Sequence, residues 1–314
     1  IEVLLLVAGL ATKGLFVCER YSTDTSHVSR SLLWGESAFG DQDRFPSRAI
    51  EAGNDVLVFG SAGAAPLAEY RSSDGEDLEQ LLADNQTTAF IVLRGDELLY
   101  EDYFNGSSHD ALQTSFSVAK SFTATLIGIA VDEGIFTSLD DPVTDYLPEL
   151  AERDERYTDI TLRHLLTMSS GLSFDDGGGP WDDPANTYHG TDLRSAVLDT
   201  PRIEGSPGET FHYNDWNVIM LGLALERASG MQVTDYAATR LWQPMGAEAD
   251  GSWSLDSDHH RFEKMFVGLN ARAIDFARFG WLYINDGHNG DDQVIPSAFV
   301  HEATRVDATT DPAS

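Results

Sequence analysis

A serine and a lysine three residues apart form the most chemically suggestive pair in the chain, Ser117 and Lys120. Small and apolar residues follow them at helical spacing as far as Gly134, which predicts a buried helix with Ser117 in its first turn. On that helix the two side chains share one face. A serine hydroxyl becomes a nucleophile when a base takes its proton, and a lysine amine is such a base where burial and a helix N-terminus disfavour its charged form.

The alternative is an amphipathic helix on which Lys120 merely extends its ammonium to solvent. The composition bears on this choice, because the 20 basic residues comprise 17 arginines and only three lysines, Lys13, Lys120 and Lys264. Lysine is rarely buried. A chain that avoids lysine yet places one in an apolar helix favours the catalytic interpretation.

The charge balance is strongly acidic, with 52 acidic against 20 basic residues and a formal net charge of −32. This excludes nucleic-acid binding through a basic surface. Acidic pairs such as Asp140-Asp141 and Asp291-Asp292 recur along the chain. With so few lysines, they predict adaptation to high salt, since molar salt shortens the Debye length to about 3 Å and screens self-repulsion. An acidic protein from a mesophile is the alternative.

Residues 1–17 are apolar apart from Glu2, Thr12 and Lys13. A spanning helix needs about 20 apolar residues. We therefore expect a remnant of a membrane anchor or signal, attached outside the cytoplasm, with a buried N-terminal helix as the alternative. Residues 18–75 contain no motif and are expected to form an N-terminal extension on the main domain.

Metal and disulfide chemistry have little support in the sequence. The single cysteine, Cys18, excludes an internal disulfide and a cysteine-based metal site. The nine histidines show no ligand spacing, and the pair His259-His260 is expected at the surface. We expect neither a metal nor an organic cofactor.

The helices and strands expected around Ser117 and Lys120 indicate an α+β domain over residues 76–314, with a helical subdomain at about 141–265. A short helix at 77–84 precedes a β-hairpin made of 88–93 and 97–104, and strands followed by a long helical middle favour antiparallel pairing. Further helices are expected at 142–147, 162–168, 216–228, 233–241, 273–284 and 295–303.

Two further segments contain candidate site residues. The loop 174–190 fits no regular pattern, as is typical of lids and binding loops. Its Trp181 and Tyr188 are expected to line a substrate pocket, or else only to fix the loop. Tyr213 precedes a predicted helix; to act as a base, its phenol needs a nearby cation such as Lys120. The alternative for Tyr213 is a half-buried core tyrosine.

Three ordered motifs, at 117–120, 165–172 and 211–214, together resemble serine hydrolases of the β-lactamase and penicillin-binding-protein superfamily. The resemblance covers roughly residues 85–305 and is strongest to the class C-like branch, which includes esterases, D-amino-acid peptidases and nylon-oligomer hydrolases. It implies a β-lactamase-like antiparallel sheet flanked by helices. It also makes Ser117 the nucleophile, Lys120 its base partner and Tyr213 the proton carrier to the leaving group.

The function that the resemblance implies is cleavage of a small ester or amide through an acyl-enzyme on Ser117. Within the superfamily, a β-lactamase or a peptidase of D-amino-acid or cell-wall peptides is the alternative. A catalytically inactive binding or sensor protein on the same fold is the alternative from another class.

Two departures from the family pattern matter. Asp215 stands where the family usually has Asn or Ser, and we expect it in the substrate-binding part of the site. A carboxylate only accepts hydrogen bonds and would favour a protonated Lys120, which counts against β-lactams and favours esters or unusual amides. The chain also reaches Ser314 without the family's C-terminal strands, so we expect truncation and an incomplete sheet. His288-Asn289-Gly290 matches a family motif formally, but it lies in a polar turn between two predicted helices.

Overall fold

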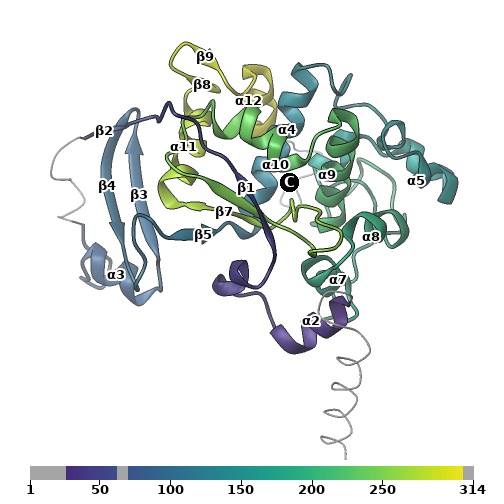
Figure 1. The fold of residues 1–314 in the computed structure, drawn as a ribbon, viewed down its shortest axis with the longest axis horizontal. Coiled ribbons are helices and arrows are strands. Elements are labelled where there is room, and N and C mark those ends of the chain that lie inside the picture. The colour runs from purple at the N-terminus through teal and green to yellow at the C-terminus, as the bar shows by residue number, and fades with distance from the viewer. Residues whose placement is uncertain (1–25, 62–69, 307–314) are drawn as a thin grey trace, which may run out of the picture.

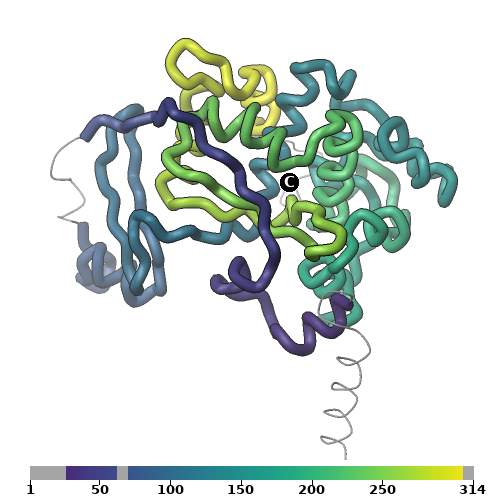
Figure 2. Tube along the Cα trace, viewed as in Figure 1, coloured from purple at the N-terminus to yellow at the C-terminus, as the bar shows by residue number. Residues whose placement is uncertain are grey.

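Two adjoining parts, one with most of the strands and one mainly helical, make up the computed structural model, which describes residues 26–61 and 70–306 (Figure 1). The tube in Figure 2 shows the N-terminal segment running across both parts, from the helical side towards the outer sheet. The predicted α+β class is confirmed, with antiparallel sheets flanked by helices.

The strands of the described residues form a four-stranded sheet in the order β1-β6-β7-β5, a three-stranded sheet in the order β2-β4-β3, and the small hairpin β8-β9. All pairs are antiparallel except β2 with β4. The bounds are β1 (Ser47–Ile50), β2 (Gly60–Ser61), β3 (Ala89–Arg94), β4 (Glu97–Tyr103), β5 (Leu112–Thr114), β6 (Gly251–Ser254), β7 (Leu269–Arg272), β8 (His288–Asn289) and β9 (Asp292–Gln293).

The helices cover the sheets and form the second part. Their bounds are α2 (His27–Trp34), α3 (Leu78–Asp84), α4 (Ala119–Asp132), α5 (Pro148–Arg153), α6 (Leu162–Leu166), α7 (Asp183–His189), α8 (Leu193–Asp199), α9 (Asp215–Ser229), α10 (Val233–Ala237), α11 (Ala273–Ile284) and α12 (Ser297–Thr304). Helix α9 ends at Gly230, whose left-handed φ of 68° suits a residue without a Cβ.

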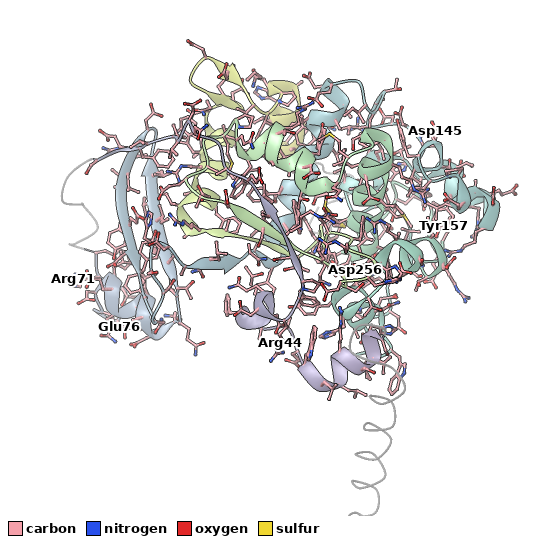
Figure 3. All side chains as sticks on the ribbon, viewed as in Figure 1. Arg44, Arg71, Glu76, Asp145, Tyr157 and Asp256 are labelled. Atoms are coloured by element: carbon pink, nitrogen blue, oxygen red, sulfur yellow. The ribbon has the colours of Figure 1, made fainter. Side chains whose placement is uncertain are left out.

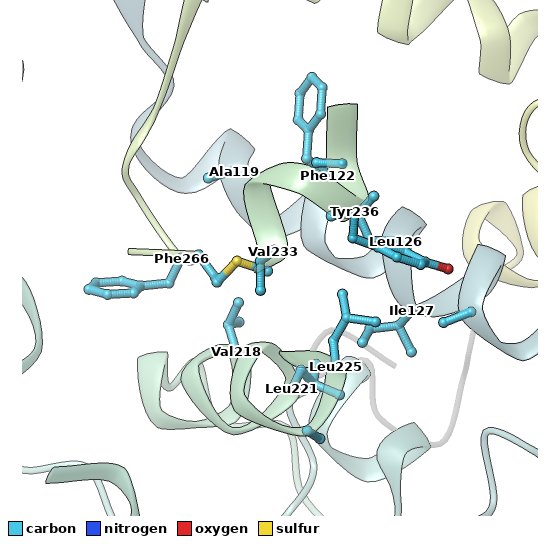
Figure 4. Close-up of a cluster of buried hydrophobic side chains, with 14 of the residues drawn as sticks. Ala119, Phe122, Leu126, Ile127, Val218, Leu221, Leu225, Val233, Tyr236 and Phe266 are labelled. Carbon is cyan, nitrogen blue, oxygen red and sulfur yellow. The ribbon is translucent and has the colours of Figure 1, made fainter. Parts of the chain in front are cut away.

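The core that supports the site lies where α4, α9 and α10 meet (Figure 4). Leu126 of α4, Leu221 of α9 and Tyr236 of α10 are buried there. Burial of an aliphatic side chain of this size stabilises the fold by about 1.5–3 kcal/mol. Phe122 of α4 also stacks on Phe279 of α11, with ring centroids 3.7 Å apart. These contacts fix the start of α4 relative to both parts of the molecule.

Buried polar groups join the helical part to the connection between β6 and β7. Asp256, labelled in Figure 3, accepts backbone N–H groups from Leu193, Ser257 and Phe262 at 3.0, 2.7 and 2.9 Å. Burial raises the pKa of this carboxyl group. Its acceptor oxygens nevertheless fix α8 to the loop that carries Phe262.

Several predicted elements differ from the structure. The segment 142–147 forms only a 3-10 turn, Val143–Asp145, and the helix expected at 233–241 continues after Ala237 as a π turn, Ala238–Trp242. The loop 174–190, for which no regular element was predicted, contains α7. That helix forms because the Asp182 side chain accepts from Ala185 N and Pro184 occupies a first-turn position.

The segment expected to be an N-terminal extension contributes to both parts. Strand β1 pairs with β6 inside the larger sheet, and α2 packs against α7. The predicted anchor or signal at 1–17 and Cys18 lie outside the described residues. Within residues 26–61 and 70–306, no helix is long and apolar enough to cross a membrane.

Candidate active site

Ser117 lies where β5 leads into α4, in a single 3-10 turn, Phe116–Val118, that continues directly into the helix. The residue before it, Phe116, has a φ of 43°, in the left-handed region that non-glycine residues rarely adopt. Such backbone strain costs about 1–3 kcal/mol and gathers at functional sites. The Phe116 ring packs edge-on against Phe39, with centroids 5.6 Å apart. The side chain of Ser117 itself is exposed at this corner.

Lys120 is held by three oxygen atoms around its Nζ. The ammonium donates to Ser117 Oγ at 3.2 Å and to the carbonyl oxygen of Phe266 at 3.0 Å. Its third neighbour is Asp215 Oδ1 at 2.8 Å, an ion pair whose angles fall short of those of a hydrogen bond. The Lys120 side chain is only 11% exposed. An amine that loses one proton here keeps two N–H groups for the Phe266 and Asp215 oxygens and directs its lone pair to Ser117.

Asp215 is the first residue of α9, which Asn214 caps. The Asn214 side chain accepts from Trp216 N at 2.9 Å and donates to the carbonyl oxygens of Leu172 and Ser173, both at 3.1 Å. These contacts join the start of α9 to the segment after α6. The cap therefore fixes the backbone that carries Asp215 towards Lys120.

Tyr213 lies two residues before α9 and is half exposed. Its ring faces Lys120 Nζ, which lies 4.8 Å from the ring centroid, within the range of a cation–π contact. The ammonium thus lies next to both Ser117 and Tyr213. The structure brings the three residues predicted as catalytic to one place and adds Asp215 to them.

Trp181, predicted to bind substrate, belongs to the segment that carries Pro180 and Asp182. Its side chain is 76% exposed and is not among the residues that line the neighbouring hollow. The loop is closed on itself instead, because the Asp182 side chain accepts from Gly179 N at 2.6 Å. Tyr188, the second aromatic residue of this segment, does line the hollow, and its hydroxyl donates to Asp41 Oδ2 at 2.8 Å.

A second lysine beside the site has no role in the sequence-based prediction. Lys264 is fully buried and donates to the carbonyl oxygens of Thr187, at 3.3 Å, and of Tyr188, at the end of α7. Thr187 Oγ1 in turn donates to Asp215 Oδ2 at 3.5 Å. Burial, with nearby Arg30 second, lowers the Lys264 pKa to about 7. The sequence did contain a signal that could have indicated Lys264, namely the rarity of lysine in the chain and the apolar residues around this one.

Among the described residues, no group of three or more His, Cys, Asp or Glu side chains is arranged to hold a metal ion. His288 and Asn289 form β8, and Gly290 begins the turn to β9, between α11 and α12. The sequence predicted a polar turn between two helices at this place.

Comparison with known proteins shows the family to which the chain belongs. The family model described as Beta-lactamase matches residues 76–312. The chain belongs to the beta-lactamase family. The predicted family is thereby confirmed.

Two curated relatives illustrate the sequence similarity. The 6-aminohexanoate-dimer hydrolase of Paenarthrobacter ureafaciens is 31% identical over 242 residues, which are 71% of this chain and 58% of that protein. Penicillin-binding protein 4* of Bacillus subtilis (strain 168) is 30% identical over 174 residues, 53% of this chain and 34% of that protein. The chain thus spans about a third to three-fifths of the length of these relatives.

A solved structure supports the fold. A Bacillus anthracis protein assigned as a 6-aminohexanoate-dimer hydrolase superposes with a TM-score of 0.74 at 23% identity, over 84% of this chain and 72% of that one. At this identity the likeness shows the fold alone.

Proposed function

We propose that the protein is a serine hydrolase that forms an acyl-enzyme on Ser117 and cleaves a small ester or amide. The observation that carries the proposal is the contact of Lys120 Nζ with Ser117 Oγ at 3.2 Å, at the start of a buried helix. The hydrolase names among the relatives and the order of the three sequence motifs support it.

The proposed acylation uses Lys120 as the base. Ser117 Oγ attacks the substrate carbonyl carbon while its proton passes to Lys120 Nζ, and a tetrahedral oxyanion forms. The N-terminal end of α4 faces this charge with its partial positive potential. The carbonyl–leaving-group bond then breaks, and Tyr213 supplies the proton that the leaving alkoxide or amine needs.

Deacylation repeats these steps with water in place of Ser117. A water molecule attacks the acyl carbon, and the Tyr213 phenolate left by acylation accepts one proton of that water. The acid product leaves as Lys120 returns its proton to the Ser117 oxygen.

The ion pair between Asp215 and Lys120 favours a second candidate, a binding protein that does not turn over substrate. The contact at 2.8 Å holds Lys120 Nζ against a carboxylate as well as against Ser117. In that case Lys120 would only position Ser117 and would not take its proton. Ligands would bind without forming a covalent bond.

Labelling with a fluorophosphonate separates the two candidates. The hydrolase proposal predicts stoichiometric modification of wild-type protein at Ser117, located by peptide mass spectrometry, and none in Ser117→Ala. Exposed Ser108 lies close in sequence, so Ser108→Ala is the matched control and should label like wild type. Absence of labelling at every salt concentration tested would favour the binding protein.

A further inference from the structure

A hollow of about 610 Å³ opens beside the proposed active site, between α2 and the segment 178–189. Its size lies within the roughly 300–1,000 Å³ of small-molecule sites. One of its lining residues is Asp215, whose Oδ1 contacts Lys120 Nζ. The hollow therefore adjoins the residue that pairs with Lys120.

The outer wall of the hollow comes from a part of the chain in which the sequence showed no motif. Leu32 and Glu36, with neighbouring residues of α2 and its C-terminal end, line this side. Leu32 is 55% exposed, a large apolar side chain directed at an open site. Pro180 and Pro184 of the opposite wall add further apolar surface.

This wall is fixed in place by a buried arginine. Arg30 of α2 donates to the carbonyl oxygens of Gly190, at 3.3 Å, and of Asp256, at 2.5 Å, and so ties α2 to the residues that follow α7. Its guanidinium also lies over the rings of Trp34 and Phe45, 5.1 and 5.6 Å from their centroids. A site with fixed walls loses less entropy when it binds a ligand.

The charges around the hollow are of one sign. Glu36 and Asp215 are acidic, and neither lysine nor arginine is among its lining residues. His189 also lines it, and burial lowers its pKa to about 4, so that its imidazole is neutral at pH 7. An anion that entered would meet two carboxylates and no lysine or arginine of the lining.

We propose that this hollow is the substrate-chain subsite and that α2 determines specificity by binding an aliphatic chain that carries no negative charge. The inference rests on the proposed function for the identity of the neighbouring nucleophile. Leu32 contributes the apolar contact, and Glu36 repels acidic chains.

Equilibrium binding to the Ser117→Ala protein, measured by calorimetry, tests the inference without turnover. The probes are N-butylhexanamide and the same amide with a terminal carboxylate on its acyl chain. Leu32→Asp should weaken binding of the neutral amide by about fivefold or more, because an apolar contact is replaced by a charge. Leu33→Asp is the matched control, since Leu33 is 57% exposed on the same helix but does not line the hollow. It should change binding by less than about twofold.

Glu36→Gln tests the charge rule. It should tighten binding of the carboxylate-bearing amide by about threefold and leave the neutral amide unchanged. No binding of the neutral amide, or equal effects of Leu32→Asp and Leu33→Asp, would overturn the inference. Fluorophosphonate labelling of Ser117 in the wild-type protein is recorded in parallel. Selective binding without labelling would overturn only the proposed function, and labelling with equal effects of the two leucine variants would overturn only the inference.

Discussion

Asp215 Oδ1 and Lys120 Nζ form an ion pair at 2.8 Å, and the same ammonium lies 3.2 Å from the hydroxyl oxygen of Ser117. The amine of the proposed base therefore contacts both the proposed nucleophile and a carboxylate. Both side chains are largely buried, at 11% and 17% exposure, so that solvent screens this pair less than a surface pair.

Asp215→Asn should raise amide turnover relative to ester turnover. The substitution removes the carboxylate that pairs with Lys120 Nζ at 2.8 Å. The asparagine offers an N–H donor to a substrate amide, whereas a carboxylate only accepts. Stopped-flow kinetics with matched ester and amide substrates measure the ratio. Asp258→Asn, at an exposed site, is the control. Equal ester-to-amide ratios in Asp215→Asn and wild type would refute the role of Asp215.

Tyr213→Phe should lower kcat by about a hundredfold or more, the usual contribution of general acid–base catalysis. The phenyl ring can keep its place beside Lys120, so the substitution removes the hydroxyl alone. Exposed Tyr70→Phe is the control and should leave kcat unchanged. An unchanged kcat in Tyr213→Phe would show that the phenol carries no proton in the rate-limiting step.

Lys264→Met should change the pH dependence of stability. The pKa of Lys264 is lowered from 10.5 to about 7 in the folded protein. Between these values the unfolded state binds more protons, so wild-type stability rises with pH across this window. The variant lacks this rise, so its stability relative to wild type should be highest below pH 7. The difference in free energy of unfolding, variant minus wild type, should fall by more than about 1 kcal/mol between pH 7 and pH 10.

Urea unfolding at about pH 6 and about pH 10 checks the Lys264 prediction. The variant also loses the two hydrogen bonds that Lys264 donates, but this loss lowers stability at both pH values alike, so the difference between them reports the charge. Exposed Arg261→Met is the control on the same connection. A pH-independent difference between Lys264→Met and wild type would show that the folded lysine keeps its charge throughout this range.

Stability should also rise with salt. The net charge of −32 opposes folding at low ionic strength, and salt screens it. The Tm in scanning calorimetry should increase steeply from about 0.1 M to molar KCl. A flat curve would show that the acidity is no adaptation to salt.

Periodic apolar patterns and turn residues predicted some of the regular elements closely. The helix at 273–284 has the predicted bounds, and the hairpin of β3 and β4 differs from prediction by a residue or so at its ends. Both have strong local signals. Helix α7 was missed because its N-cap, Asp182, follows a glycine-rich run that reads as irregular, although Asp182 and Pro184 together are a recognisable start signal.

The candidate site was predictable in its residue types but not in its detailed contacts. Ser117, Lys120 and Tyr213 came from ordered motifs, and the structure brings them together. The position of Trp181, the backbone acceptor of Phe266 and the strained φ of Phe116 depend on tertiary packing, which no local pattern encodes.

The most direct test of the account is mass spectrometry of protein mixed with p-nitrophenyl acetate and quenched in acid. Acyl transfer through Ser117 predicts a covalent species heavier than the protein by one acetyl group, with the added mass on the peptide that contains Ser117. Ser117→Ala should show no such species. An acetyl group on another residue, or turnover of the ester by Ser117→Ala at the wild-type rate, would contradict the assignment of Ser117 as the nucleophile.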